Sequence, residues 1–438
     1  MNIIETFERL FPLNRSITGN GLRQSLRIIG EEIPLAMIEY PTDMVCFDWE
    51  VPKEWNVKEA WLEDMEGNRI VDFANSNLHL LGYSISFQGV VTKEELMPHL
   101  YTLKDMPDAI PYVTSFYEER WGFCVPYNIY ERLDRSHYRV HIDTELTPGS
   151  MTVGEGIIKG RTEKEILLHT YIGHPSMAND QLSGPLTMML VCKWLLENRD
   201  SLHYSYRILF CPETIGTIAY LSQNIGHLKS NMIAGYVVAF TGDRGQLTYK
   251  MSKDKDSLSN RAALNVLNNS QRKHRILPYT PYGADERQFN SPGINLEMGA
   301  IMRSGPGEYK AYHTSLDDRD IISEESIQDS AKFLIETIQN LEANKTISPL
   351  HTMCEPKLDK KGLYTTLGKN GEDKTLGRQI LGIWGLSDSH NDLIAVADTL
   401  QVPGYSLMKA LKEAEKARII KAERESEHDT QSKKQDTV

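Results

Sequence analysis

The chain has 438 residues, long enough for two or three domains, and its 40% hydrophobic and 25% charged content is ordinary for a globular protein with a sizeable core. Its formal net charge of −12 argues against a protein whose main task is to neutralise phosphates or to coat an anionic membrane. We therefore expect neither nucleic acid nor a membrane as a partner, and self-association is left open.

The five cysteines are scattered and never spaced as CxxC: Cys46, Cys124, Cys192, Cys211 and Cys354. This pattern favours reduced thiols and offers neither a disulfide framework nor a thiolate zinc site. The N-terminal MNIIETFERLFPLNRSITG lacks an uninterrupted apolar run, so we predict no signal peptide, and nothing later predicts a membrane span. These features predict a cytoplasmic protein.

The first two thirds of the chain predict an α/β domain with a small insertion. Two short helices are expected around residues 3–10 and 20–33. Residues 47–106, with segments such as AWLEDMEGNRIVDF, alternate as short strands and predict a small β-rich inserted domain. From about residue 139, nearly continuous apolar strands alternate with helices, which predicts a mostly parallel sheet covered on both faces. Residues 1–46 and 107–345 would form this three-layer domain.

The last part of the chain predicts a third domain and a tail. In residues 346–422, the helical pattern NDLIAVADTL, the turn QVPG and a second helix over 405–420 indicate a winged helix, with a wing near GLYTTLG (362–368). The polar residues 423–438 have no apolar periodicity and are expected to be disordered.

Polar residues follow several of the predicted buried strands, at the sheet edge where functional residues of α/β proteins gather. His174 comes just after EILLHTYIG, and Asp180 lies six residues later. Imidazole and carboxylate are standard zinc ligands, and one loop could aim both at a single point. The alternative is an ordinary polar loop in which Asp180 caps the following helix at Ser183.

Two further residues complete the candidate site. Glu213, in FCPETIG, ends another buried strand, where a carboxylate is costly unless it is hydrated, paired or catalytic; the alternative is an acid favoured by the dipole of the next helix. His313, in AYHTSLDD, has Asp317 and Asp318 nearby as residues that could orient its imidazole. Three such features at strand ends are harder to dismiss together than one.

These residues suit metal-assisted amide hydrolysis. His174, Asp180 and His313 would supply three protein ligands and leave the open position that a catalytic zinc site needs. Zinc would acidify a water and polarise the scissile carbonyl. Glu213, which is not a ligand in this scheme, would take the proton from that water and deliver it to the leaving amine.

Four segments carry a resemblance to a known family. ANDQLSG resembles the ANDNASG-type segment of the co-catalytic zinc aminopeptidases, PETIG their AEE-type segment, YHTSLDD their YHTPxD segment, and GADERQFNSPGINLEMG their SDHxxF…GIP stretch. Order and spacing agree over residues 150–345. With LNRSITG, HPSMAND, DERQ and the helix-turn-helix, the whole chain is most similar to a bacterial subgroup associated with polysaccharide biosynthesis. The resemblance implies the aminopeptidase fold, an inserted small domain and a winged helix.

The departures from that family concern the metal count. The two-zinc enzymes have a second, metal-binding glutamate after the base, where this chain has Thr214. They also have an aspartate at the end of the next strand, where this chain has Ala239 or its neighbours, with Asp243 a few residues late. The aspartate expected two residues after the first histidine is Ser176. One complete ligand set remains, so we expect one zinc ion rather than two.

The resemblance also implies that Asp285, Glu286 and Arg287 line the same pocket and bind substrate. Arg287 would hold a substrate carboxylate or a developing oxyanion; an ordinary salt bridge with Asp285 or Glu286 is the alternative. A peptide N-terminus is the family's usual substrate, and an amide of a sugar or small metabolite is a second option. A catalytically silent protein that acts as a regulator, or binds DNA or a partner, through its winged helix is the rival from another class.

Overall fold

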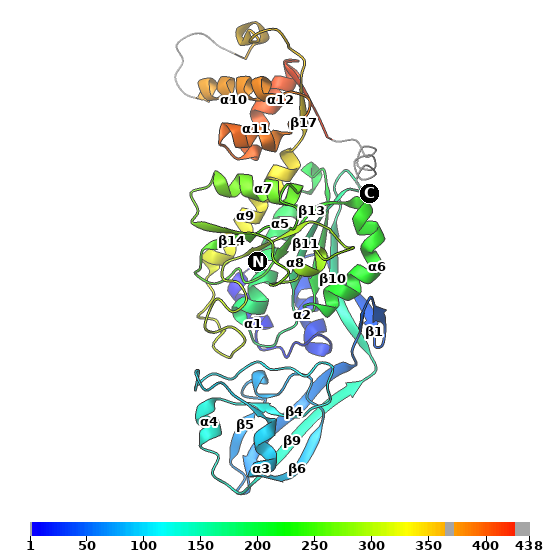
Figure 1. Ribbon diagram of the computed structural model, residues 1–438, viewed down its shortest axis with the longest axis vertical. Helices are drawn as coiled ribbons and strands as arrows, with labels where there is room; N and C mark the ends of the chain where they lie inside the picture. The colour runs from blue at the N-terminus through cyan, green and yellow to red at the C-terminus, as the bar shows by residue number, and fades with distance from the viewer. Residues whose placement is uncertain (1, 364–371, 425–438) are drawn as a thin grey trace. The chain divides into compact units, whose positions relative to one another are not determined.

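A computed structural model describes residues 2–363 and 372–424 of the chain (Figure 1). Its contacts divide into two compact units. The first comprises the described residues up to 259 together with 273–332, and the second comprises 260–272 together with the described residues from 333 onward. No helix in these described stretches combines the length and the apolar character needed to cross a membrane.

The first unit is built on an eight-stranded sheet with the order β1-β10-β12-β11-β13-β16-β14-β15. The central strands β12, β11, β13 and β16 are mutually parallel. At one edge, β10 is antiparallel to β12, and β1 is antiparallel to β10. At the other edge, β14 and β15 are parallel to each other and antiparallel to β16. The bounds of these strands are β1 Ala36–Pro41, β10 Ser150–Ile158, β11 Glu165–Tyr171, β12 Ser205–Cys211, β13 Met232–Val238, β14 Leu247–Lys250, β15 His274–Leu277 and β16 Met298–Met302.

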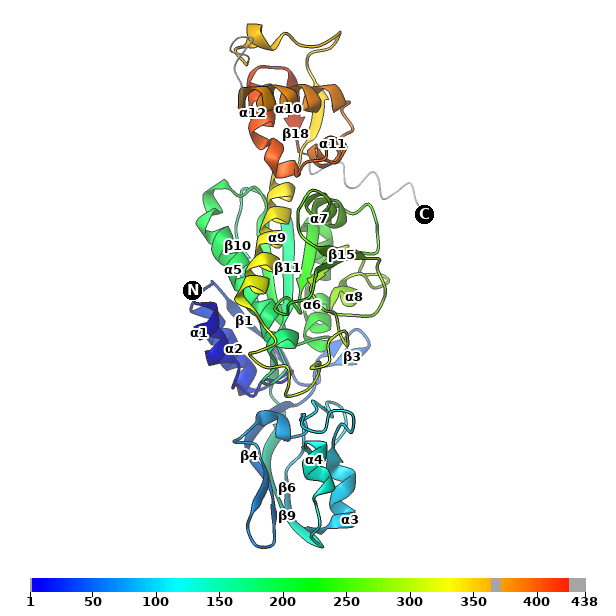
Figure 2. The same ribbon diagram turned by 90° about the vertical axis from the view of Figure 1, so that its left-hand side faces the viewer.

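The central strands are buried on both faces. Every residue of β11 and of β12 is buried, which explains their continuous apolar sequence. α5 (Ser183–Glu197) connects β11 to β12, and α6 (Ile215–Asn231) connects β12 to β13 on the other side of β11. The two connections therefore run in opposite directions across the sheet. Because such crossovers are right-handed, the two helices lie on opposite faces of the sheet. Figures 1 and 2 show helices on both faces. The predicted three-layer, mostly parallel α/β fold is confirmed.

Further helices complete the first unit. α1 (Ile3–Leu10) begins where the Asn2 side chain accepts hydrogen bonds from the backbone N–H groups of Ile4 and Glu5. α2 (Asn20–Gly30) packs against β10. α8 (Glu286–Phe289) packs against β16. The longer α9 (Glu324–Ala343) follows the loop that carries His313, and the boundary between the two units falls within it, after Lys332.

A second sheet in this unit has the order β5-β4-β9-β6. Its strand β9 (His137–Thr147) is antiparallel to both β4 and β6. β9 lies outside residues 47–106, the range predicted for the inserted domain, so this sheet includes a strand from well beyond it. The remaining elements of this part are β2 Val45–Cys46, β3 Trp49–Glu50, β4 Glu54–Asp64, β5 Arg69–Asp72, β6 Phe87–Thr92, α3 Lys93–Leu96, β7 Leu100–Tyr101, β8 Phe123–Cys124 and α4 Tyr127–Glu131.

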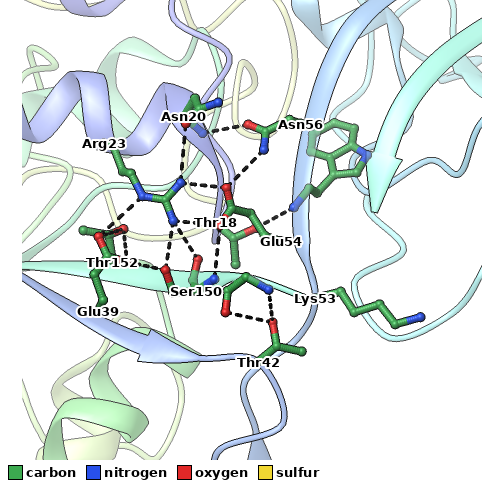
Figure 3. A network of polar contacts seen from close by, with 12 residues as sticks. Thr18, Asn20, Arg23, Glu39, Thr42, Lys53, Glu54, Asn56, Ser150 and Thr152 are labelled. Atoms are coloured by element: carbon green, nitrogen blue, oxygen red, sulfur yellow. Dashed lines mark hydrogen bonds and ion pairs between the residues drawn. The ribbon is translucent and has the colours of Figure 1, made fainter. Parts of the chain in front are cut away.

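A polar network joins this second sheet to the large one (Figure 3). Arg23 of α2 donates to both carboxylate oxygens of Glu54, at the start of β4, with both distances 2.7 Å. The same guanidinium donates to Ser150 at the start of β10, and Ser150 Oγ donates to Glu39 of β1 at 2.5 Å. Two segments of the chain connect the two sheets, and they end at Glu54 and at Ser150. The network therefore fixes the position of both connections.

The second unit contains a small helical core closed by a two-stranded sheet of β17 (Thr346–Pro349) and β18 (Ile420–Glu423). α11 begins at Asp392, whose side chain accepts from the N–H of Ala395 and pairs with Arg261 of α7 at 2.5 Å. The described helices of this unit are α7 Leu258–Asn268, which begins just before the unit boundary, the part of α9 from Phe333 onward, α10 Glu372–Leu386, α11 Leu393–Leu400 and α12 Met408–Lys416.

Three predictions for the C-terminal part need correction or lie outside the described residues. The helix predicted over 405–420 is shorter: α12 ends at Lys416, because Arg418 has a φ of 53° and Ile420 starts β18. Glu423, predicted as the start of the tail, is the last residue of β18. The predicted wing near 362–368 falls mostly, and the predicted disordered tail almost wholly, outside the described residues.

Candidate functional site

His174 lies in the loop after β11, and its backbone is held from two sides. Its N–H and that of Gly173 donate to Gln181 Oε1, at 3.1 and 2.6 Å. Its carbonyl oxygen accepts from the fully buried Arg15 at 2.9 Å. Burial lowers the pKa of His174 to about 4, so the imidazole is neutral at neutral pH, which is the form that binds metals.

Asp180 lies in a single π-helical turn, Ala178–Leu182, that precedes α5. Asp317 fixes this turn, because its two carboxylate oxygens accept from the backbone N–H groups of Asn179 and Asp180 at 2.8 and 2.9 Å. Asp180 does not cap α5. Asp180 is 2% exposed, and its carboxylate faces His313.

His313 sits in the loop before α9 with a φ of 55°. Its ring stacks on Tyr312 with centroids 3.9 Å apart. The structure differs here from the sequence prediction that Asp317 and Asp318 orient this imidazole: Asp317 binds the Asp180 turn, and Asp318 accepts from the N–H of Asp320. Short polar loops offer many hydrogen-bond partners, and the sequence does not select among them.

The structure brings His174, Asp180 and His313 together. One ligand atom from each lies within 4.8 Å of the others, and His313 Nε2 is 3.0 Å from Asp180 Oδ2. Two buried polar atoms at this point, Asp180 Oδ2 and His313 Nε2, have no hydrogen-bond partner within the described residues. Buried polar atoms are normally satisfied, so these unpaired atoms fit a metal ion as their common partner. The donor set, two imidazoles and a carboxylate, suits zinc.

Glu213 lies beside this cluster, with Oε2 3.8 Å from His174 Nε2. The next residue, Thr214, has φ 63° and ψ −77°, and Ile215 N–H donates to Glu213 O at 2.8 Å, which makes a strained classic γ-turn. Burial, followed by the negative charges of Asp285 and Asp180, raises the pKa of Glu213 well above its usual range, and Arg287 lowers it. A carboxylate with a raised pKa suits proton transfer near neutral pH.

Asp285, Glu286 and Arg287 play different parts around Glu213. Asp285 is fully buried and accepts from Thr214 N–H at 3.0 Å and from Thr217 Oγ1 at 2.6 Å, so it supports the γ-turn. Glu286 is also fully buried and pairs with Lys250 at 2.7 Å. Arg287 has Glu213 as its ion-pair partner, at 3.9 Å, instead of its neighbours Asp285 and Glu286. Its guanidinium donates to Thr214 Oγ1 and to the carbonyl oxygens of Gly283 and Ala284.

Two further residues at this site have no counterpart among the residues chosen from the sequence. Arg15 belongs to LNRSITG, a segment noted only for its family resemblance. Tyr112 belongs to MPDAIPYV, which carries no regular periodicity, yet its ring centroid is 4.6 Å from that of His174 and 5.3 Å from that of His313. Asp243, considered as a late ligand, instead accepts from Asn179 Nδ2 at 2.9 Å and from Ser304.

Comparison with known sequences divides the chain into two matched regions. A family model described as a domain of unknown function, DUF4910, matches residues 4–344, and a winged helix-turn-helix model matches residues 345–422. A Clostridium acetobutylicum protein is 41% identical over 395 residues, which cover 90% of each chain. Its name refers to polysaccharide biosynthesis and to an aminopeptidase-like domain.

Solved structures agree with the fold. A crystal structure from Clostridium acetobutylicum, named as a candidate peptidase, superimposes with a TM-score of 0.89 at 38% identity over 96% of both chains. The zinc aminopeptidase BSAP from Bacillus subtilis has a TM-score of 0.54 at 11% identity and covers 78% of this chain and 95% of its own. A likeness at 11% identity concerns the fold, which is aminopeptidase-like.

Proposed function

The chain belongs to the family described as a domain of unknown function, DUF4910, and from that premise we propose that it is a metal-dependent amide hydrolase, in the first place an aminopeptidase. His174, Asp180 and His313 are the proposed zinc ligands, and Glu213 is the proposed general base. The aminopeptidase-like fold and the name of the 41% identical relative support this reaction class.

One observation carries the proposal: ligand atoms of His174, Asp180 and His313 converge to within 4.8 Å of one another, those of Asp180 and His313 have no hydrogen-bond partner among the described residues, and the Glu213 carboxylate lies beside them. A bound zinc ion would supply Lewis acidity toward water and toward the amide carbonyl. Glu213 is close enough to take a proton at this point and to pass it to the leaving amine. The γ-turn at Thr214 and the support from Asp285 keep its carboxylate at the edge of the cluster.

The surroundings of Glu213 support one metal ion over two. One of its carboxylate oxygens is 3.8 Å from His174 and the other is 3.9 Å from Arg287. The guanidinium is a fixed positive charge on the far side of Glu213, held by Thr214 Oγ1 at 2.6 Å. A second divalent cation there would be repelled. Arg287 is also available, on the Glu213 side, to a substrate carboxylate or an oxyanion.

The substrate follows less directly from the geometry. A peptide N-terminus is the first candidate because of the aminopeptidase-like fold. The relative named for polysaccharide biosynthesis supports an amide of a sugar or small metabolite as a second candidate. A panel of aminoacyl arylamides together with N-acylated amino sugars separates the two.

The test compares Glu213→Gln with the wild type. The substitution keeps the shape of the side chain and removes the base, so hydrolysis should fall by roughly 10²–10⁴-fold. Elemental analysis should give about one zinc per chain in both proteins, and the melting temperature should be retained. Asp318→Asn is the matched control, because Asp318 lies in the His313 loop and its carboxylate binds the backbone N–H of Asp320.

Different failures point to different errors. Full activity in Glu213→Gln would remove Glu213 as the base, and loss of zinc in that variant would make it a ligand. A wild type that cleaves nothing in the panel would favour the hypothesis of a catalytically silent regulator.

For the regulator hypothesis, α12 presents three exposed lysines at helical spacing, Lys409, Lys412 and Lys416. If the protein is such a regulator, we expect it to bind duplex DNA in a salt-sensitive way, and we expect Lys412→Glu to weaken that binding.

A further inference from the structure

The segment from Ile110 to Val113 lies directly against the loop that carries His313. Tyr112 N–H donates to His313 O at 2.8 Å, and Ser315 N–H donates to Ile110 O at 2.8 Å. Ile110 N–H in turn donates to Ser315 Oγ at 3.0 Å. The backbone of Tyr112 is therefore fixed relative to the backbone of His313.

The same segment also packs against the loop that carries His174 and Asp180. Met177, which lies between these two residues in sequence, is fully buried in a small apolar cluster with Leu78, Ile110 and Cys124. Tyr101, Tyr112 and Val113 pack against this cluster. Tyr112 is thus held against both loops that supply the proposed ligands, by hydrogen bonds on one side and by apolar packing on the other.

The ring of Tyr112 contacts both imidazoles. It is tilted by 48° to His174 at 4.6 Å and stands edge-on to His313 at 5.3 Å, with an interplanar angle of 85°. The two imidazoles are 5.2 Å apart. Histidine ligands of metals are usually oriented by a hydrogen bond from the ring nitrogen that does not bind the metal. Tyr112 adds a packing contact to each of the two imidazoles.

We propose that Tyr112 is a positioning residue of the metal site: its aromatic ring fixes the imidazoles of His174 and His313 by packing. This inference rests on the proposed function, since it assumes that the two histidines bind zinc. It also gives the segment from Ile110 to Val113 a role in supporting the metal site. A flat ring with two contacts restricts imidazole rotation, whereas an aliphatic side chain of similar volume leaves more freedom.

The test measures zinc affinity and ligand geometry without relying on turnover. Tyr112→Phe keeps the ring and Tyr112→Leu removes it. The zinc dissociation constant, measured by competition with a chromophoric chelator, should be little changed in the Phe variant and raised roughly 10–100-fold in the Leu variant. The visible spectrum of the cobalt-substituted Leu variant should differ from that of the wild type, and the Phe spectrum should not. Tyr112→Met, flexible and similar in size, replaces the Leu variant if the latter does not fold.

Tyr101→Leu is the matched control, because Tyr101 packs on the same apolar cluster. It should leave zinc affinity and the cobalt spectrum unchanged, and a loss equal to that of Tyr112→Leu would reduce the effect to general packing. A folded Tyr112→Leu protein with wild-type zinc affinity and spectrum would overturn the inference alone. A Phe variant as weak as the Leu variant would assign the effect to the hydroxyl and overturn it too. A wild type that binds no zinc would overturn the proposed function itself.

Discussion

Arg15 is fully buried, and its guanidinium donates to two backbone carbonyl oxygens, those of Leu10 and His174. Burial lowers the pKa of Arg15 to about 9, because desolvation disfavours the charged form. Among the described residues Arg15 has no carboxylate ion-pair partner, and two hydrogen bonds to carbonyl oxygens offset only part of the cost of burying a cation. The position of His174 therefore depends on a residue near the N-terminus of the chain.

We predict that Arg15→Lys is destabilising and weakens zinc binding. Lysine keeps the charge but lacks the planar fork that reaches both carbonyl oxygens, and each buried carbonyl left unpaired costs about 1–3 kcal/mol. Urea denaturation should show a loss of that order in the free energy of unfolding, and chelator competition should show a higher zinc dissociation constant. Arg9→Lys, at the exposed pair with Glu31, is the control and should change neither. An unchanged Arg15→Lys protein would mean that Arg15 does not hold His174.

The sequence predicts roles for His174, Asp180, Glu213 and His313 because each follows a buried strand or lies in a polar loop, and side-chain chemistry at such places is readable from one sequence. It predicts no role for Arg15 or Tyr112. Their roles come from contacts with residues far away along the chain, to a carbonyl oxygen in one case and to two rings in the other. Neither contact leaves a periodicity or a spacing in the local sequence.

At the scale of elements, the start of β4 depends on one ion pair. Glu54 Oε1 and Oε2 each accept from Arg23 at 2.7 Å, and Asn56 and the N–H of Ser150 add further hydrogen bonds (Figure 3). The hydrogen bond from Arg23 is the largest cause that lowers the pKa of Glu54, to about 2. Carboxylates with a depressed pKa stabilise the folded state when they are ionised.

This pair predicts a specific acid response. The contribution of Glu54 to stability is fully present above the unfolded-state pKa of about 4.3 and is lost as the pH falls through about 2. We expect Glu54→Gln to be less stable than the wild type at pH 7 and to show a shallower fall in melting temperature between about pH 5 and 2. Thermal denaturation at stepped pH checks this. Glu31→Gln, at an exposed pair, should follow the wild-type curve, and parallel curves for Glu54→Gln and wild type would contradict the prediction.

Strand burial explains which elements were predictable. β11 and β12 are buried on both faces, so their sequences are apolar throughout and identify a parallel sheet. β9 alternates between buried and mostly half-buried residues, and alternation does not say which sheet the strand joins. The sequence therefore places β9 with its neighbours in the chain, whereas its hydrogen bonds place it between β4 and β6.

At the scale of the whole molecule, the division into two units has a thermodynamic consequence. All three proposed ligands lie in the first unit, so zinc should stabilise that unit only. At 100 times the dissociation constant, ligand binding adds about 2.7 kcal/mol to stability. We predict two calorimetric transitions, of which zinc raises one and leaves the other unchanged.

Two variants assign the transitions. His313→Ala should abolish the zinc-dependent shift, and Leu411→Ala, in the buried core of the second unit, should lower the zinc-independent transition by an amount typical of a core truncation, about 2–5 kcal/mol. A single transition that shifts as a whole with zinc would show that the two units unfold cooperatively. Zinc that shifts the transition lowered by Leu411→Ala, and not the other, would contradict the ligand assignment.

The order of the site residues along the chain also bears on synthesis. Arg15 leaves the ribosome first, then Tyr112, His174 and Asp180, and His313 emerges last, just before α9. A growing chain therefore carries at most two of the three proposed ligands until nearly all of the first unit has been made. The site cannot capture an ion with full affinity during elongation, and a chain cut short before His313 would be recognisable by its inability to retain zinc.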